Sequence, residues 1–260
     1  MAEQTVLYEG DTAMNHYRIV DGLYDGRPAR VLYSGDGKAA QSGVAHDDEP
    51  DLLFDYNQRF LELAQNVTPE RILVIGGGAY TLPLALLWAL PDSTIDVVEP
   101  DHELQGLAER FFGLPVGNER LRHFHTDGRH FLETNQQKYD LIVIDAFVHT
   151  AIPRDLMTIE AARSLRRHLT DKGVTAMNVI SGMHGRSAFV IRSLYAAYCQ
   201  VFAASDIFYA SRGYTLWLPQ NFVLTGQVDA TIPLKDYVRH TAITPPEINP
   251  NEALTDNATQ

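Results

Sequence analysis

The chain has 260 residues, of which 45% are hydrophobic, and this composition suits a globular protein with a sizeable buried core. Its 33 acidic residues outnumber its 21 lysines and arginines, and the formal net charge of -12 disfavours nucleic acid or an anionic membrane surface as a partner. The sequence contains neither a secretion signal at its start nor the roughly 18 uncharged apolar residues of a membrane span, so we expect a cytoplasmic location.

The first part of the chain, residues 1–50, predicts a small antiparallel sheet. Three short β-like runs, at 16–20, 29–35 and 39–44, alternate with turns rich in glycine and aspartate. The segment 50–67 then carries apolar residues at helical spacing. A helix is therefore expected before the first strand of the main core.

From residue 70 onward, apolar strands alternate with helices. Strands are expected at 71–76, 94–99, 121–126, 139–145 and 173–180. Helices are expected near 81–90, 101–112, 128–135, 155–168 and 185–200. This alternation is typical of a parallel sheet with helices on both faces. The predicted fold class is therefore α/β, doubly wound, with the small antiparallel sheet at its N-terminus.

Two runs near the C-terminus, 202–210 and 220–226, predict final strands that pair antiparallel, because no helical segment separates them. The polar, proline-containing residues 244–260 predict a flexible tail. The expected organisation is thus a β-domain at 1–50, an α/β domain at 51–243 and the tail.

The ends of the first two core strands carry features of a nucleotide site. Ligands of an open α/β sheet bind beyond the carboxyl ends of its strands. Gly76, Gly77 and Gly78 follow the first strand and allow the backbone to turn tightly and approach a flat ligand, and Thr81 is expected to cap the next helix. Glu99 ends the second strand, about 20 residues further on, where a carboxylate can accept hydrogen bonds from both hydroxyls of a ribose.

The later strands also end in polar residues. Asp127, followed by Gly128, can accept a hydrogen bond from the exocyclic amine of adenine, and Asp145 stands where a carboxylate can act as a base or hold a cation. Asn178 is a further candidate for the lining of the site. Each acid taken singly is explained equally well as a helix cap or an exposed strand end. Their recurrence at successive strand ends favours a ligand site.

A nicotinamide dinucleotide is the rival ligand, because Gly76, Gly78 and a downstream acid resemble its fingerprint. Thr81 stands where that fingerprint has its third glycine, and the acids after the third and fourth strands have no role in it. An adenosine that carries a sulfonium uses all of these features. His123 and His125 lie on one face of a strand without a third ligand nearby in the sequence, so no metal is expected.

Four stretches of the sequence resemble the spermidine synthase family of S-adenosylmethionine-dependent transferases: "LVIGGG", the acid at the end of the second strand, "DGR" and "YDLIVIDAF". The likeness extends from about Gln41 to Gly226. It implies a Rossmann-like, seven-stranded class I fold. It also implies S-adenosylmethionine or its decarboxylated form as the donor, and transfer of an aminopropyl group to a small amine acceptor in polyamine biosynthesis. It further suggests a homodimer.

The same resemblance implies roles for individual residues. Glu99 would bind the ribose, Asp127 and Gly128 would lie at the adenine, and Gln41 would approach the nucleoside. The loop of Gly76, Gly77 and Gly78 would lie beside the sulfonium tail. Asp145 would take a proton from the attacking amine, and Tyr56 would face the acceptor. His149 is a candidate acceptor contact for a different reason, because it follows the end of the fourth strand.

The chain departs from the family pattern where the family binds amines. Ala79 and Val148 each replace an aspartate, and Asn57 and Gln58 replace a histidine and a glutamate. Each charged hydrogen bond is worth about 1.5–3 kcal/mol, so these losses predict weak binding of polyamines. A methyltransferase on the same fold and a catalytically silent nucleoside-binding homologue therefore stay open as alternatives.

Overall fold

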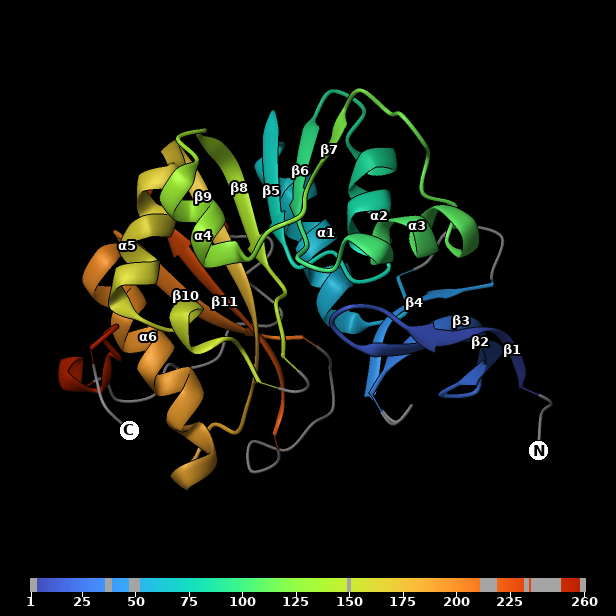
Figure 1. Cartoon of the computed structure of the whole chain (residues 1–260). Helices are drawn as coiled ribbons and strands as arrows, with labels where there is room; N and C mark the ends of the chain where they lie inside the picture. The colour runs from blue at the N-terminus through green and yellow to red at the C-terminus, as the bar shows by residue number, and fades with distance from the viewer. Residues whose placement is uncertain are drawn as a thin grey trace.

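The computed structural model describes residues 4–35, 39–46, 52–148, 151–210, 219–231, 234 and 249–257, and within them the chain forms two sheets (Figure 1). The smaller sheet is antiparallel in the order β1-β2-β3-β4 and lies beside α2 and α3. Its strands are β1 (Thr5–Asp11), β2 (His16–Tyr24), β3 (Arg27–Ser34) and β4 (Ala39–Ala45). The predicted N-terminal antiparallel sheet is confirmed, with β1 as a strand that the sequence pattern does not predict.

The larger sheet has seven strands in the order β10-β11-β9-β8-β5-β6-β7. They are β5 (Arg71–Ile75), β6 (Thr94–Val98), β7 (Leu121–Phe124), β8 (Tyr139–Ile144), β9 (Leu169–Ser181), β10 (Ala204–Tyr209) and β11 (Gln220–Gln227). Strands β5 to β9 pair in parallel, whereas β11 is antiparallel to both β9 and β10. The seven-stranded α/β prediction and the antiparallel pairing of the last two strands are confirmed.

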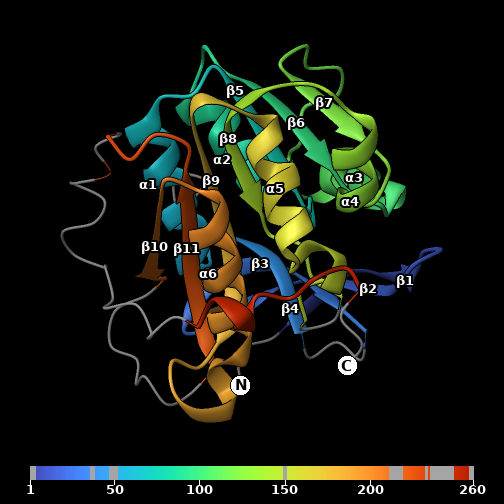
Figure 2. The ribbon, with the colours of Figure 1, turned by 90° about the vertical axis from the view of Figure 1, so that its left-hand side faces the viewer.

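Helices cover both faces of the larger sheet. One face is covered by α1 (Asp55–Val67), α2 (Thr81–Ala89) and α3 (His102–Phe111), and the other by α4 (Gly128–Thr134), α5 (Ile159–His168) and α6 (Phe189–Val201). Figure 2 shows α5 and α6 in front of the sheet and α1 behind it. Short 3-10 turns stand at η1 (Arg154–Leu156), η2 (Gly185–Ala188) and η3 (Pro250–Glu252).

The residues of β5 explain why the core strands are apolar throughout. Successive residues of a strand point to opposite faces of the sheet. Leu73 and Ile75 join the apolar cluster under α4, α5 and α6, whereas Ile72 and Val74 join the cluster under α1 and α2. A strand covered on both sides has no solvent-facing positions, so its sequence is a continuous apolar run.

One helix start and one helix cap differ from the sequence expectation. The helix predicted at 155–168 begins at Ile159, because the Thr158 side chain accepts a hydrogen bond from the Ala161 N–H and caps it there. Thr81 was expected as a cap, and this prediction is wrong. Thr81 is the first helical residue, and Tyr80 precedes it in the left-handed region with φ of 58° and a buried ring.

The C-terminal segment 249–257 packs on the main domain. Ala253 and Leu254 lie against the apolar cluster under α4, α5 and α6, and the Ile159 N–H donates to the Leu254 carbonyl at 2.8 Å. Residues 249–257 thus make defined contacts within the tail predicted at 244–260, whose flexibility stays a prediction. Residues 50 and 243 lie outside the described residues, so the predicted domain boundaries stay predictions. No helix formed by the described residues has both the length and the apolar character needed to cross a bilayer.

Candidate active site

A cavity of about 520 Å³ lies where β5, β6 and β8 end, between the larger sheet and the N-terminal sheet. The strand order changes direction around β5, and such a crevice is the usual ligand site of an open α/β sheet. The predicted site residues on its wall are Gln41, Tyr56, Gly76, Gly77, Gly78, Glu99, Asp127, Gly128 and Asp145. His149, predicted to face the acceptor, lies outside the described residues.

The glycine loop is pressed between β8 and β4. At Gly76, φ is 100°, and an added Cβ would lie 2.2 Å from the carbonyl oxygen of Asp145. At Gly78, φ is 51°, and an added Cβ would lie 2.7 Å from the Ser42 Oγ. A side chain at either position would be strained and would clash. These glycines therefore bring the loop backbone to the cavity wall.

Glu99 points toward the glycine loop. Its Oε2 accepts hydrogen bonds from the N–H groups of Gly77 at 2.9 Å and Gly78 at 3.1 Å, and its Oε1 accepts from the Asp101 N–H at 3.0 Å. Burial raises the pKa of Glu99, while these three N–H groups act in the opposite direction. A carboxylate has about four lone-pair directions. Three are used here, so Oε1 keeps capacity for one ligand hydroxyl rather than the two expected from the sequence.

Asp101 connects this site to the N-terminal sheet. It is buried, and it accepts hydrogen bonds from the Thr12 hydroxyl at 2.5 Å and from the Tyr17 hydroxyl. Burial and the charges of Asp101 and Glu99 raise the pKa of Tyr17, which therefore stays a hydrogen-bond donor. The smaller sheet thus helps to hold the Glu99 end of the cavity.

Asp145 is a carboxyl group of the cavity with a strongly raised pKa. The Asn178 Nδ2 donates to its Oδ1 at 2.9 Å, and the Tyr56 hydroxyl also bonds to it. Burial raises the pKa of Asp145 from its ordinary value of 3.8 to about 6, although both hydrogen bonds oppose the shift. A carboxylate of this kind is a stronger base than an exposed aspartate.

A chain of amides fixes the orientation of Asp145. The Asn221 Nδ2 donates to the Asn178 Oδ1 at 2.9 Å, which leaves the Asn178 Nδ2 free to donate to Asp145. Asn178 is buried, and both asparagines line the cavity. Asn178 thus lines the cavity, as the sequence predicts.

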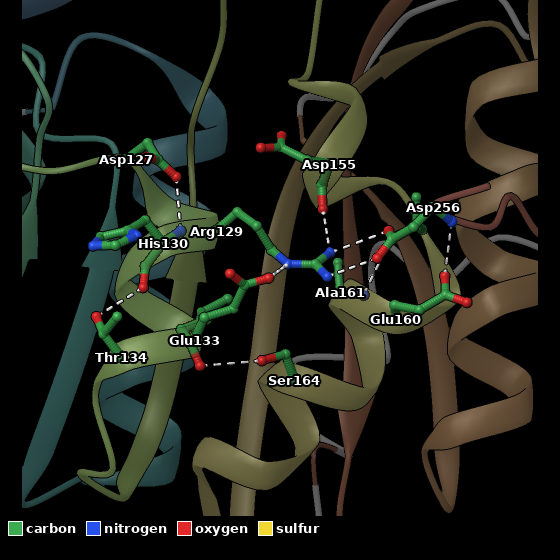
Figure 3. A network of polar contacts seen from close by, with 12 residues as sticks. Asp127, Arg129, His130, Glu133, Thr134, Asp155, Glu160, Ala161, Ser164 and Asp256 are labelled. Atoms are coloured by element: carbon green, nitrogen blue, oxygen red, sulfur yellow. Dashed lines mark hydrogen bonds and ion pairs between the residues drawn. The ribbon is translucent and has the colours of Figure 1, made fainter. Parts of the chain in front are cut away.

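Asp127 caps a helix and also lines the cavity. Its Oδ1 accepts from the His130 N–H at 2.7 Å and so caps α4, as Figure 3 shows, while the residue also lines the cavity. An added Cβ on Gly128 would lie 2.4 Å from the Ile75 side chain, so only glycine allows the start of α4 to pack this closely on β5.

The four departures from the family pattern differ in their surroundings. Val148 lines the cavity and is 60% exposed. Ala79 is buried against the N-terminal sheet, and its N–H donates to the Ser42 Oγ at 3.2 Å. Asn57 is buried in α1, and Gln58 donates to the Leu52 carbonyl at 2.9 Å. Of these four, only Val148 faces the cavity.

Several residues of the cavity wall escaped sequence reasoning, among them Tyr17, Ser42, Asn221 and Arg129. Nothing in the sequence around Tyr17 or Ser42 predicts that they line the cavity, because their position there depends on how the smaller sheet packs against the larger one. The position of Asn221 could have been predicted. Because β11 is antiparallel to β9, the start of β11 lies at the edge of the sheet where the parallel strands end.

We expect Asp145→Asn to stabilise the fold at neutral pH. The pKa of Asp145 is raised in the native state, so the folded protein keeps this carboxyl protonated at pH values where the unfolded chain has already lost the proton. The contribution of Asp145 to the stability of the fold therefore falls as pH rises from about 4 to 6. The variant does not titrate. Its advantage in the free energy of unfolding is therefore near zero at pH 4 and roughly 1–3 kcal/mol at pH 8. Urea unfolding of the wild type and the variant at the two pH values measures this difference. A difference that does not change with pH contradicts the raised pKa of Asp145.

Comparison with known proteins gives a family match over more than half of the chain. The family model of the Spermine/spermidine synthase domain matches residues 59–210. The polyamine aminopropyltransferase of Vibrio vulnificus is 38% identical over 136 residues, which are 50% of this chain and 44% of that protein. The chain therefore spans less than half the length of this relative.

Solved structures agree on the fold. A probable spermidine synthase from Corynebacterium glutamicum superposes with a TM-score of 0.74 at 20% identity, over 88% of this chain and 82% of that one. Human methyltransferase-like protein 13, solved with SAH, gives a TM-score of 0.57 at 22% identity, over 68% of this chain and 82% of that one. At these identities the structural likeness shows only a shared fold. Because the family model covers more than half of the residues, the chain belongs to the spermine/spermidine synthase domain family.

Proposed function

We propose that this protein transfers an aminopropyl group from decarboxylated S-adenosylmethionine to a small amine, a step of polyamine biosynthesis. The observation that carries the proposal is the half-buried Asp145, held by Tyr56 and Asn178 at the wall of a cavity that also contains Glu99 and the glycine loop. Membership of the family and the polyamine aminopropyltransferase name of its relative support the same reaction.

The proposed chemistry is a displacement at carbon. The amine nitrogen attacks the methylene carbon bonded to the sulfonium, the N–C bond forms, and the C–S bond breaks with its electron pair moving to sulfur. The products are the aminopropylated amine, still carrying an extra proton, and neutral methylthioadenosine. Asp145 accepts that proton, and its raised pKa makes it a suitable base. Alignment of nitrogen, carbon and sulfur by the cavity supplies the rest of the rate enhancement.

The charges of the cavity support a cationic donor. Four acids, Glu99, Asp127, Asp145 and Asp155, are among its described lining residues. Arg129 is the one cation among these residues, and its guanidinium is already paired with Glu133 and Asp256. Such a wall favours a sulfonium with an ammonium tail and disfavours the extra carboxylate of intact S-adenosylmethionine.

The nucleoside is proposed to lie across the ends of β5, β6 and β7. Glu99 accepts a ribose hydroxyl at its Oε1, Asp127 accepts from the adenine amine, and Gly128 and Gln41 contact the nucleoside. The loop of Gly76, Gly77 and Gly78 passes beside the sulfonium tail. The support is that all of these residues line one cavity and that Glu99 and Asp127 keep an acceptor oxygen for a ligand.

The acceptor is proposed to enter beside Asp145. Tyr56 stacks on Phe54 with ring centroids 5.8 Å apart, and Tyr24 meets Phe54 edge-on at 5.6 Å. These three rings form an aromatic wall next to the base, suited to an ammonium group or to methylene groups. His149 stays a predicted acceptor contact, and the homodimer and the cytoplasmic location stay predictions as well.

A product assay tests the proposal. The protein is incubated with decarboxylated S-adenosylmethionine and a panel of small amines including putrescine, and mass spectrometry follows methylthioadenosine and the aminopropylated amine. Both products are expected in equal amounts. Methylthioadenosine binding without turnover on any amine would favour a silent nucleoside-binding homologue. Methylated product formed from intact S-adenosylmethionine would favour a methyltransferase, for which the fold shared with methyltransferase-like protein 13 is the present support.

A further inference from the structure

The C-terminal segment 249–257 lies across the outside of α5 and α6, far in sequence from the residues it contacts. Glu252 forms an ion pair with Arg192 of α6, and Leu254 forms a parallel bridge with Thr158 at the start of α5. In Figure 2 this red segment passes in front of α6. The segment is therefore docked at several points along its length.

Asp256 makes the most extensive contacts of this segment. Its two carboxylate oxygens accept hydrogen bonds from Arg129 Nη1 at 3.2 Å and Nη2 at 2.7 Å, and Oδ1 also accepts from the Thr158 hydroxyl at 2.6 Å. Its N–H donates to the Glu160 Oε2 at 3.1 Å. Figure 3 shows Asp256 meeting Arg129 from α4 and Glu160 from α5. One aspartate thus joins the C-terminal segment to two helices.

Arg129 connects Asp256 to the wall of the cavity. Its side chain is only 18% exposed, and it lines the cavity two residues after Asp127. Its Nη1 also donates to the Asp155 carbonyl at 3.1 Å, and Asp155 belongs to η1 and lines the same cavity. The guanidinium therefore ties the start of α4 to η1, which are two walls of one end of the cavity.

These walls are packed too closely to shift independently. An added Cβ on Gly128 would lie 2.4 Å from Ile75 and 3.6 Å from Leu156, so α4, β5 and η1 meet at this point. We therefore expect a displacement of Arg129 to reach Asp127 or η1, since interiors at this density transmit displacement.

We propose that Asp256 is a positioning residue for the donor nucleoside, acting by holding Arg129 and, through it, the Asp127 and η1 walls of the cavity. The proposal rests on the proposed function, which places the adenine at Asp127. The contrasting view is that the pair of Asp256 and Arg129 only helps to dock the segment and has no effect on the cavity.

The test compares Asp256→Asn with Glu252→Gln in the full chain. Asp256→Asn removes the charge that holds Arg129, while Glu252→Gln weakens the docking of the same segment at Arg192, whose contact does not reach the cavity. We expect the Kd for methylthioadenosine and the KM for the donor to rise about three- to tenfold in Asp256→Asn, with kcat unchanged. Glu252→Gln should bind like the wild type. Arg129→Lys keeps the charge but loses the bidentate contact with Asp256, so its Kd and KM should rise as in Asp256→Asn. It serves as the second variant if Asp256→Asn does not fold.

Other outcomes would contradict either the positioning role of Asp256 or the proposed function. Unchanged binding in Asp256→Asn and Arg129→Lys, or equal weakening in Asp256→Asn and Glu252→Gln, overturns the positioning role while leaving the proposed function intact. A wild-type protein that binds no methylthioadenosine refutes the proposed function, and this inference with it.

Discussion

Asp145→Asn is expected to lower turnover by about 10³-fold while leaving the Kd for methylthioadenosine within a factor of about three. The asparagine keeps the shape of the side chain and can still bond Asn178 and Tyr56, but it cannot accept the proton of the attacking amine. In the wild type, the rate should fall as pH drops through about 6, because Asp145 becomes protonated there. Steady-state rates between pH 5 and 9 and nucleoside titration measure both effects.

A control variant exists on the same strand. Asp140 is the second residue of β8, at the opposite end of the strand from Asp145. Its carboxylate accepts hydrogen bonds from the N–H groups of Glu70 and Arg71 at 3.1 and 3.0 Å, and it does not line the cavity. Asp140→Asn makes the same chemical change and should keep its turnover per folded molecule. If Asp145→Asn keeps more than about a tenth of wild-type turnover, Asp145 is not the base.

Glu99→Ala is expected to weaken methylthioadenosine binding by about 100-fold or more and to lower the free energy of unfolding by roughly 2–3 kcal/mol. The variant loses the oxygen proposed to bind the ribose. It also leaves the N–H groups of Gly77, Gly78 and Asp101 without their acceptor, so the loop loses its anchor. Titration well below the unfolding temperature separates the affinity from the stability, and urea unfolding measures the latter.

Glu103 provides the matched control for Glu99. It is an exposed acid at the start of α3, and its Oε2 accepts from the Ala13 N–H at 3.0 Å rather than from the glycine loop. Glu103→Ala should bind methylthioadenosine like the wild type. Wild-type affinity in Glu99→Ala would place the ribose elsewhere in the cavity.

The acids of the candidate site follow from local sequence, for a physical reason. Parallel strands end at one edge of their sheet, so Glu99, Asp127 and Asp145 had to meet once their strands were recognised. The hydrogen-bond partners of these acids could not be predicted from local sequence. That Glu99 holds Gly77 and Gly78, and that Asn221 orients Asn178, depends on side-chain directions set by packing.

The contacts of the C-terminal segment could not be predicted from local sequence. A polar stretch with prolines has too little apolar surface to predict a packed element, and residues 249–257 read as a flexible tail. Their docking depends on charges placed far away in the sequence, on Arg129 and Arg192. Tyr80 is a similar case: its burial against the core holds it in a left-handed conformation that its residue type disfavours.

The sequence by itself determined the alternation of strands and helices, the parallel sheet and the row of acids at the strand ends, because these depend on periodicity and on residues close in the chain. Only the tertiary structure decided which atoms of Glu99 are already occupied, how burial raises the pKa of Asp145, and how Tyr17, Ser42 and Asp256 complete or brace the cavity. The reason is that desolvation and long-range hydrogen bonds arise only when distant segments pack together.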